Sequence, residues 1–297
     1  MPNIETLIPD IHGLLIEEGH QINEENFAVF MDAIESAVRR AIQEPGVVGG
    51  NSNLRLSKSG TGLRRVWYDA HREIPEDAPE SPKKDVGENL LRFLSGHVIE
   101  ALLLLLAKEA GYSVEYDQEE VEVEGIIGHN DAVIDGHTVD IKTASQFSFD
   151  KFKTGDIKFG NDPFGYMAQI SSYKTGFRNK YPEYDLKPGA YFWAYNKSNS
   201  EMVLTSVGDR DFVDSAGMLR DQKRTLEQAA PPPTLCYPEE EEGKSGNKVV
   251  NKNCTWCPHF KDCYKDYLGK DLRAFKYSNG VKYFTHVEKE PRVEEIK

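Results

Sequence analysis

The sequence has little of several features that would place it in a familiar class. Only four cysteines occur among its 297 residues, and all lie between positions 236 and 263, so disulfides do not hold the chain together along its length. The apolar run ALLLLL at 101–106 is far too short to cross a bilayer. No basic region followed by an apolar stretch opens the chain, so no secretory signal is expected. These features predict a soluble, cytoplasmic protein.

Positive charge is also scarce. The chain has 36 Lys and Arg against 49 Asp and Glu, a formal net charge of -13, which argues against a protein that coats nucleic acid over its whole surface but is compatible with a local positive groove. No internal repeat and no G-x-x-x-x-G-K-[ST] motif is present, so neither a repeat protein nor a P-loop helicase is expected. The length suffices for one large domain with a buried core.

What is present is a succession of helical and strand periodicities. Helical spacing occurs in residues 25–43, 87–111, 163–177 and 211–230, and strand patterns occur in 112–124, 128–144 and 189–207. The 87–111 helix is apolar on almost every side, so we expect it to be buried. The fold class predicted is α/β, with a central mixed sheet and flanking helices. We expect a helical N-terminal segment at 1–50, a core at 51–230 and a Cys-rich lobe at 231–297.

The stretch GHNDAVIDGHTVDIKTA at 128–144 carries the pattern that most suggests chemistry. Its Asp-Gly pair predicts a hairpin turn. Asp140 and Lys142 share one face of the second strand, Ile141 packs behind them, and Asp131 on the neighbouring strand can reach the same point. Two carboxylates beside an ammonium suit Mg²⁺ or Mn²⁺ and a phosphate.

Asp131 followed by Asp140-x-Lys142 resembles the PD-(D/E)XK nuclease superfamily, whose core is restriction-endonuclease-like. Other elements are similar to its RecB-like branch: Gly128 with Asp131 resembles G-x-x-D, and Gln169 with Tyr173 resembles Q-x-x-x-Y. His97 lies in the preceding helix, where that family carries a metal-binding histidine. Glu100, one turn further, shares a helix face with His97.

The resemblance implies a metal-dependent DNA exonuclease. His97, Asp131, Asp140 and the backbone carbonyl of Ile141 would hold the metal ions. Catalysis would also involve Lys142, Gln169 and Tyr173. Such enzymes act on DNA ends, including single strands, in recombination, repair or replication, and small free-standing members are common in phages, in which case the location is the host cytoplasm.

The cysteines supply a further resemblance. Cys254, Cys257 and Cys263 form C-x2-C-x5-C, similar to the C-terminal triplet of the iron-sulfur nucleases of the AddAB and CRISPR-adaptation type. Those relatives place a fourth cysteine ahead of the core, where this chain has Gly62, which leaves Cys236 to complete a local four-cysteine module. A [4Fe-4S] cluster fits the triplet, Zn²⁺ fits four local thiolates, and His259 is an alternative ligand. We favour the cluster.

The segment 54–68 is locally basic and aromatic. Its candidates for contacting a DNA backbone or an unpaired base are Arg55, Lys58, Arg64, Arg65, Trp67 and Tyr68. A folded segment without a ligand explains it equally well. Lys151, Lys153 and Lys158, in an expected loop after the Asp-x-Lys strand, are further candidates.

Two other functions remain open. A site-specific or structure-specific endonuclease would share the metal site but does not need Q-x-x-x-Y or the cysteine triplet. A non-catalytic DNA-binding protein with a zinc knuckle does not need Asp131, Asp140 and Lys142 together.

Overall fold

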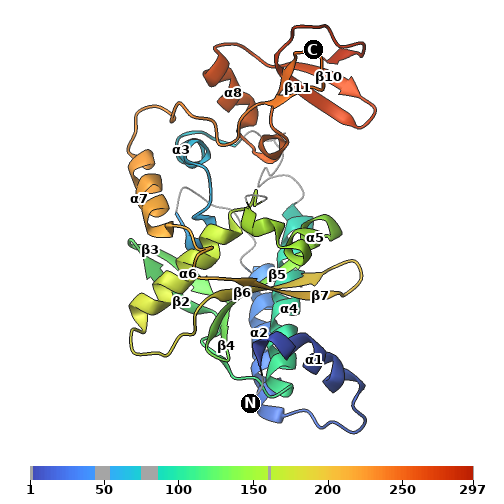
Figure 1. Cartoon of the computed structure of the whole chain (residues 1–297), viewed down its shortest axis with the longest axis vertical. Coiled ribbons are helices and arrows are strands. Elements are labelled where there is room, and N and C mark those ends of the chain that lie inside the picture. The colour runs from blue at the N-terminus through green and yellow to red at the C-terminus, as the bar shows by residue number, and fades with distance from the viewer. Residues whose placement is uncertain (1–2, 44–53, 75–85, 160–161, 297) are drawn as a thin grey trace. The chain divides into compact units, whose positions relative to one another are not determined.

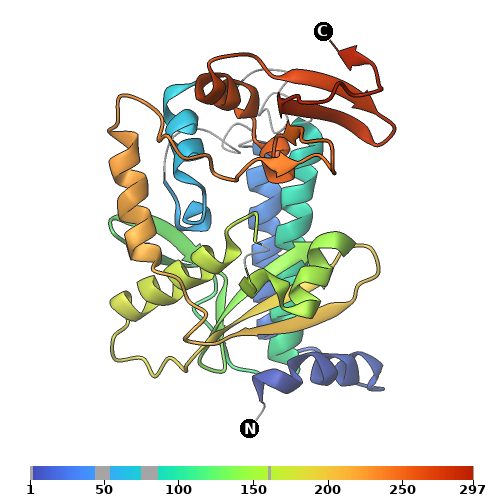
Figure 2. The ribbon, with the colours of Figure 1, turned by 45° about the horizontal axis from the view of Figure 1, so that its top comes forward.

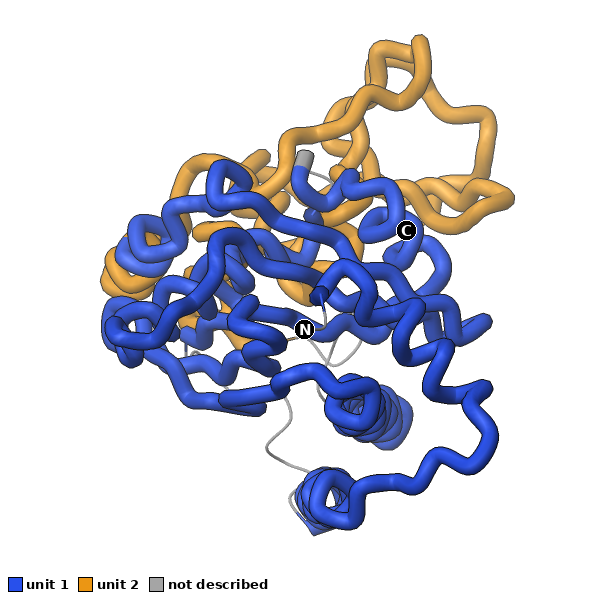
Figure 3. The backbone as a smooth tube through the Cα atoms, turned by 60° about the horizontal axis from the view of Figure 1, so that its bottom comes forward, with its two compact units in different colours: residues 1–48, 53–60, 87–220 blue, residues 49–52, 61–86, 221–297 orange. Residues whose placement is uncertain are grey.

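The structure is a computed structural model that describes residues 3–43, 54–74, 86–159 and 162–296. The chain divides into two compact units, shown in Figure 3: unit 1 comprises residues 1–48, 53–60 and 87–220, and unit 2 comprises residues 49–52, 61–86 and 221–297. The predicted boundary at 50/51 lies outside the described residues.

Unit 1 is built on a five-stranded sheet in the order β1-β4-β5-β6-β7. Its strands are β1 (Val114–Glu115), β4 (Ala132–Ile134), β5 (His137–Ala144), β6 (Ala190–Asn196) and β7 (Met202–Val207). β5 and β6 are parallel, and the other neighbours are antiparallel. This mixed sheet with flanking helices confirms the predicted α/β fold class. A separate antiparallel pair is formed by β2 (Glu119–Val123) and β3 (Ile126–Asn130).

Helices cover both faces of this sheet (Figure 1). The helices of unit 1 are α1 (Leu7–Ile16), α2 (Glu24–Gln43), α4 (Val86–Glu109), α5 (Gln146–Thr154) and α6 (Tyr166–Lys180), with the short 3-10 helices η1 (Ile4–Thr6), η3 (Leu56–Lys58) and η4 (Asp156–Phe159). The residues of α7 (Ser215–Leu226) are divided between unit 1 and unit 2. α1 and the end of α4 pack on the face that carries Val139 and Ile141. α5 and α6 pack on the face that carries Ala144 and Phe192. Because side chains alternate along a strand, Asp140 and Lys142 belong to the α5/α6 face.

The turn between β4 and β5 has the geometry that its sequence predicts. Asp135 and Gly136 both have positive φ, 48° and 80°, as a two-residue hairpin turn of this handedness requires. The turn sets the register, with Ala132 opposite Val139. A slip of one residue would turn Asp140 and Lys142 toward the other face of the sheet.

Two expectations about the helices are corrected. α4 is buried only toward its C-terminal end, while Leu91 and Phe93 are exposed, because the sheet reaches only part of this long helix. By length and composition alone, residues 87–109 could cross a membrane, but the core helix of a soluble protein can have the same length and composition. Within this helix, 22% of the most apolar 18-residue stretch is buried. The segment after β5 was expected to be a loop, but Lys151 and Lys153 lie in α5 and Lys158 lies in η4.

Unit 2 contains helices and a second sheet, although no helix or strand pattern was identified in the sequence after residue 230. It has α3 (Leu63–His71), α8 (Phe260–Leu268) and η5 (Lys252–Trp256). Its own five-stranded sheet, orange to red in Figure 2, has the order β12-β10-β11-β9-β8. The strands are β8 (Glu240–Glu241), β9 (Lys248–Val249), β10 (Arg273–Tyr277), β11 (Gly280–His286) and β12 (Glu295–Ile296).

Candidate active site and cysteine cluster

Asp131 and Asp140 stand opposite each other at the β4–β5 hairpin. Ala132 and Val139 form the paired position furthest from the hairpin turn. One residue further from the turn on each strand, Asp131 lies opposite Asp140. Oδ2 of Asp131 accepts a hydrogen bond from the backbone N–H of Ile141 at 2.7 Å. This bond holds the carboxylate of Asp131 beside β5, and the structure thus brings the two predicted carboxylates together.

Asp140 is fully buried, and Nζ of Lys142 lies 2.6 Å from its Oδ2. Apart from this ion pair, neither carboxylate oxygen of Asp140 accepts a hydrogen bond of normal geometry. Burial raises the pKa of Asp140 and of Asp131 to about 7, against the opposing effect of Lys142. Burial lowers the pKa of Lys142, but the charges of Asp140 and Asp131 outweigh burial and raise it overall, so Lys142 remains an ammonium at neutral pH.

The donor set suits a hard divalent cation. A buried carboxylate without hydrogen bonds is unfavourable unless a cation compensates it, and carboxylate oxygens are the ligands that Mg²⁺ and Mn²⁺ prefer. Within the described ranges, no three His, Cys, Asp or Glu side chains are already arranged to hold one metal ion. The ammonium of Lys142 lies against Asp140 instead. The chemistry of these residues therefore fits a metal, and the role of the Ile141 carbonyl stays a prediction.

Glu100 joins this group from α4. Burial raises its pKa to about 7, with Lys142 opposing and Asp140 adding to the shift, and the charge of Glu100 in turn raises the pKa of Asp131. Gln118 donates a hydrogen bond to Oε1 of Glu100. The only sequence signal for this residue was its spacing from His97, which does not reveal that α4 passes the carboxylates.

His97 itself is less well connected. In the described part of the chain, no hydrogen bond or ion pair joins its ring to Asp131 or Asp140. Desolvation and the charge of Arg40 lower the pKa of His97. Its predicted role as a metal ligand stays a prediction.

Gln169 and Tyr173 lie in α6 and are both buried. Nε2 of Gln169 donates to the hydroxyl of Tyr173 at 2.9 Å. Burial and the charges of Asp131 and Asp140 raise the pKa of Tyr173, which places its hydroxyl in the electrostatic field of the carboxylates. A Cβ on Gly128 would lie 3.1 Å from the ring of Tyr173, so the glycine lets β3 pack against this tyrosine.

Tyr166 is a site residue that the sequence did not identify. Its ring centre lies 5.2 Å from Nζ of Lys142, a cation–π distance. Burial raises the pKa of Tyr166, an effect that Lys142 opposes and Asp140 reinforces. No pattern around position 166 indicated this contact, because it depends on the packing of α6 over β5.

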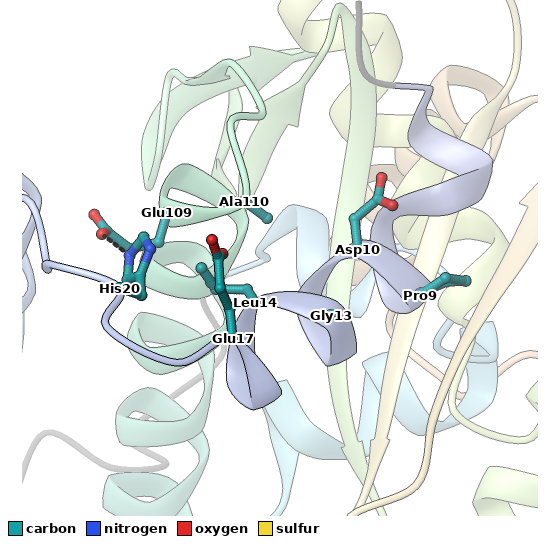
Figure 4. Close-up of a pocket in the computed structure, with 8 residues that line it drawn as sticks. All are labelled: Pro9, Asp10, Gly13, Leu14, Glu17, His20, Glu109 and Ala110. Carbon is teal, nitrogen blue, oxygen red and sulfur yellow. Dashed lines mark hydrogen bonds and ion pairs between the residues drawn. The ribbon is translucent and has the colours of Figure 1, made fainter.

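A surface hollow of about 400 Å³ lies between α1 and the end of α4 (Figure 4). Two of its acidic side chains are engaged with neighbours: Asp10 accepts a hydrogen bond from Tyr112, and Glu109 contacts His20 and Asn26. It contains none of the predicted site residues, so we assign no function to it.

In unit 2, Cys236 lies against the first turn of α3. Its sulfur accepts hydrogen bonds from the backbone N–H groups of Arg64 and Arg65, the donors that an N-cap side chain normally satisfies. The N-cap of α3 is Gly62, and a Cβ there would lie 2.6 Å from Sγ of Cys236. The sulfur of Cys236 therefore stands where a side chain at position 62 would be. Cys236 also contacts α3, a contact that the sequence did not predict, and the four-cysteine module itself stays a prediction.

The other three sulfurs also have donors. Arg64 Nε donates to Sγ of Cys263 at 2.9 Å, and the hydroxyl of Tyr264 donates to Sγ of Cys254 at 3.9 Å. The backbone N–H of His259 donates to Cys257. Burial raises the pKa of all four thiols, to about 11 for Cys257 and about 12 for Cys254.

Hydrogen-bond donors of this kind stabilise thiolates, the form in which cysteine binds a metal. No disulfide joins them, and Cys254 interacts electrostatically with each of the other three. A single zinc ion needs its thiolates close around one point, an arrangement that no three ligand side chains have among the residues described. A cubane cluster binds each thiolate through a separate iron and needs a wider arrangement. Nε2 of His259, the alternative ligand, lies 3.1 Å from Oδ1 of Asp69, so this ring nitrogen already has a hydrogen-bond partner.

The basic segment 54–68 is largely internal. Arg64 is buried and bonded to Cys263, Trp67 donates to the carbonyl of Gln228 at 2.8 Å, and Tyr68 donates to Asp266 at 2.6 Å. These side chains hold α3 within unit 2 and are not exposed for DNA. Arg55 and Lys58 of unit 1 are exposed and remain candidates.

Comparisons with known proteins add little. No protein-family model matches the chain, and no curated protein matches it. Among solved structures, the chain is similar to the crystal structure of SSO0001, with 13% sequence identity and a TM-score of 0.36 over 78% of this chain and 92% of that chain. A likeness of this size supports no argument about fold or activity.

Proposed function

We propose that this protein is a divalent-metal-dependent deoxyribonuclease that hydrolyses phosphodiester bonds from DNA ends, in recombination, repair or replication. One observation carries the proposal: among the described residues, the buried carboxylate of Asp140 has no polar partner other than the ammonium of Lys142, and it stands opposite Asp131. Such a group is unfavourable for stability and is typical of a functional site. The preference for DNA ends rests on the resemblance of Gln169, Tyr173 and the cysteine triplet to RecB-like nucleases.

The residues have distinct roles in this mechanism. Asp131 and Asp140, with Glu100 nearby, would hold the divalent ions, which when bound supply Lewis acidity and orient the phosphate and water. Lys142 is already protonated at neutral pH, so it stabilises the negative charge that builds on the phosphate in the transition state and does not remove a proton. Gln169 and Tyr173, which are joined by a hydrogen bond, would position the DNA strand near the scissile phosphate.

We further propose that Cys236, Cys254, Cys257 and Cys263 hold a [4Fe-4S] cluster. The hydrogen bonds from Arg64, from backbone amides and from Tyr264 would stabilise the thiolates when the cluster forms. Its role in this chain would be structural, because the cysteines tie α3 to the C-terminal part of unit 2.

The test is a paired measurement on anaerobically purified protein. An absorption spectrum is recorded, and the protein is then incubated with Mn²⁺ or Mg²⁺ and end-labelled linear or covalently closed DNA. We expect a broad visible band and cleavage of linear DNA alone. Asp140→Ala should abolish cleavage and leave the visible band intact, whereas the exposed Asp185→Asn should change neither. Cleavage by Asp140→Ala, or no cleavage by the wild type with either metal, would refute the proposal.

A further inference from the structure

A continuous series of aromatic and lysine side chains leads from Lys142 to the surface of unit 1. The ring of Tyr166 lies over Lys142, and the ring centre of Phe164 is 5.5 Å from that of Tyr166. Phe164, Tyr166 and Lys151 line one small hollow. Nζ of Lys151 lies 5.0 Å from the ring centre of Phe147. We call these five residues the aromatic track.

The outer part of the aromatic track is open to solvent. Phe164 and Phe147 are 59% and 66% exposed, although phenylalanine is usually buried. Neither ring belongs to a hydrophobic core cluster of unit 1. Exposed aromatic rings beside lysines, continuous with a candidate active site, are typical of a binding surface.

The inner part is held in place by the fold. Asp162 accepts hydrogen bonds from the backbone N–H groups of Tyr166 and Met167, at 2.9 and 2.8 Å, which fixes the start of α6. The ring of Tyr166 also stacks on Phe152, with ring centres 5.8 Å apart. The aromatic track is therefore anchored at Tyr166, and its outer rings come from the start of α5 and the segment before α6.

We infer that the aromatic track binds single-stranded DNA and delivers its end to Asp140, an inference that rests on the proposed nuclease function. Unpaired bases stack on aromatic rings without regard to sequence, and lysines between the rings neutralise the phosphates. Bases in a duplex are already stacked on each other, so their faces are not available to stack on Phe147 or Phe164. The surface thus selects a single strand.

The test is fluorescence anisotropy with a labelled oligo-dT and with a labelled duplex, in an Asp140→Asn background without divalent metal. Phe164→Ala and Phe147→Ala should each weaken oligo-dT binding ~10-fold, while Phe164→Trp keeps it. Phe93→Ala, which removes an exposed ring from α4, is the matched control and should change nothing. Lys151→Gln should lower the slope of log K against log salt by ~0.7.

The inference is overturned if Phe164→Ala and Phe147→Ala bind oligo-dT as tightly as the parent protein does. It is also overturned if the duplex binds the parent as tightly as oligo-dT does and loses as much affinity in the two variants. Its failure is distinguishable from that of the proposed function. Wild-type protein that cleaves linear DNA while the ring variants bind normally refutes the aromatic track alone. Ring variants that lose oligo-dT binding, in a protein whose wild type never cleaves, support the aromatic track and refute the nuclease.

Discussion

Asp140→Asn should stabilise the metal-free protein while abolishing its activity. Burial raises the pKa of Asp140 from its usual 3.8 to about 7, so the folded state disfavours the ionised form. One pKa unit corresponds to ~1.4 kcal/mol, and a shift of this size destabilises the fold by on the order of 4 kcal/mol above pH 7. The charge of Lys142 is already included in this pKa, but burying an amide without hydrogen bonds offsets part of the gain, which leaves ~1–3 kcal/mol of net stabilisation.

The pH dependence follows from the same shift. Between about pH 4 and pH 7 the folded protein holds a proton on Asp140 that the unfolded chain has lost. Stability of the metal-free wild type should therefore fall as pH rises through this window, with Asp131 acting in the same direction because burial raises its pKa to about 7. Asp140→Asn removes the contribution of Asp140 to this loss of stability. The variant and the wild type should therefore have similar stability near pH 4 and differ most above pH 7.

The assay is scanning calorimetry in chelator at pH 5 and pH 7.5, with amide hydrogen exchange across β5 to locate the change in unit 1. We expect the Tm of Asp140→Asn to exceed that of the wild type by roughly 2–8 °C at pH 7.5. Mn²⁺ should stabilise the wild type more than the variant. The exposed Asp185→Asn is the control and should leave the Tm unchanged. An equal or lower Tm for Asp140→Asn at pH 7.5 would refute the reasoning.

Three further predictions concern other parts of the protein. Cys236→Gly should lose iron, sulfide and the visible band, and adding Gly62→Cys should restore them, because the side chain of the new cysteine would occupy the space that the side chain of Cys236 leaves; a cluster unaffected by Cys236→Gly contradicts this. Gly60→Ala should lower the free energy of unfolding in urea by ~2 kcal/mol or more, since its Cβ would lie 2.4 Å from the backbone of Gly165, whereas Gly13→Ala, which meets open space, should not. Glu100→Gln should reduce cleavage ~10–100-fold, and an effect no larger than that of an exposed glutamate variant would remove it from the site.

The periodicity of the chain determined the local part of the site. The Asp-Gly turn sets the hairpin, and the two-residue repeat of a strand puts Asp140 and Lys142 on one side with Ile141 behind them. The four-residue spacing of Gln169 and Tyr173 likewise predicts their contact within one helix. These relations depend only on backbone geometry over a few residues, so the sequence is sufficient to predict them.

Only the tertiary structure decided which distant segments meet. It brings Glu100 and Tyr166 to the carboxylates, exposes Phe147 and Phe164, and buries Arg64 where a basic surface had been considered. It also places the sulfur of Cys236 in the space left by Gly62. None of these contacts has a local signal, because the same residue types at the same spacing could face solvent or core. The choice is made by the packing of helices on the sheets, which depends on the whole fold of each unit.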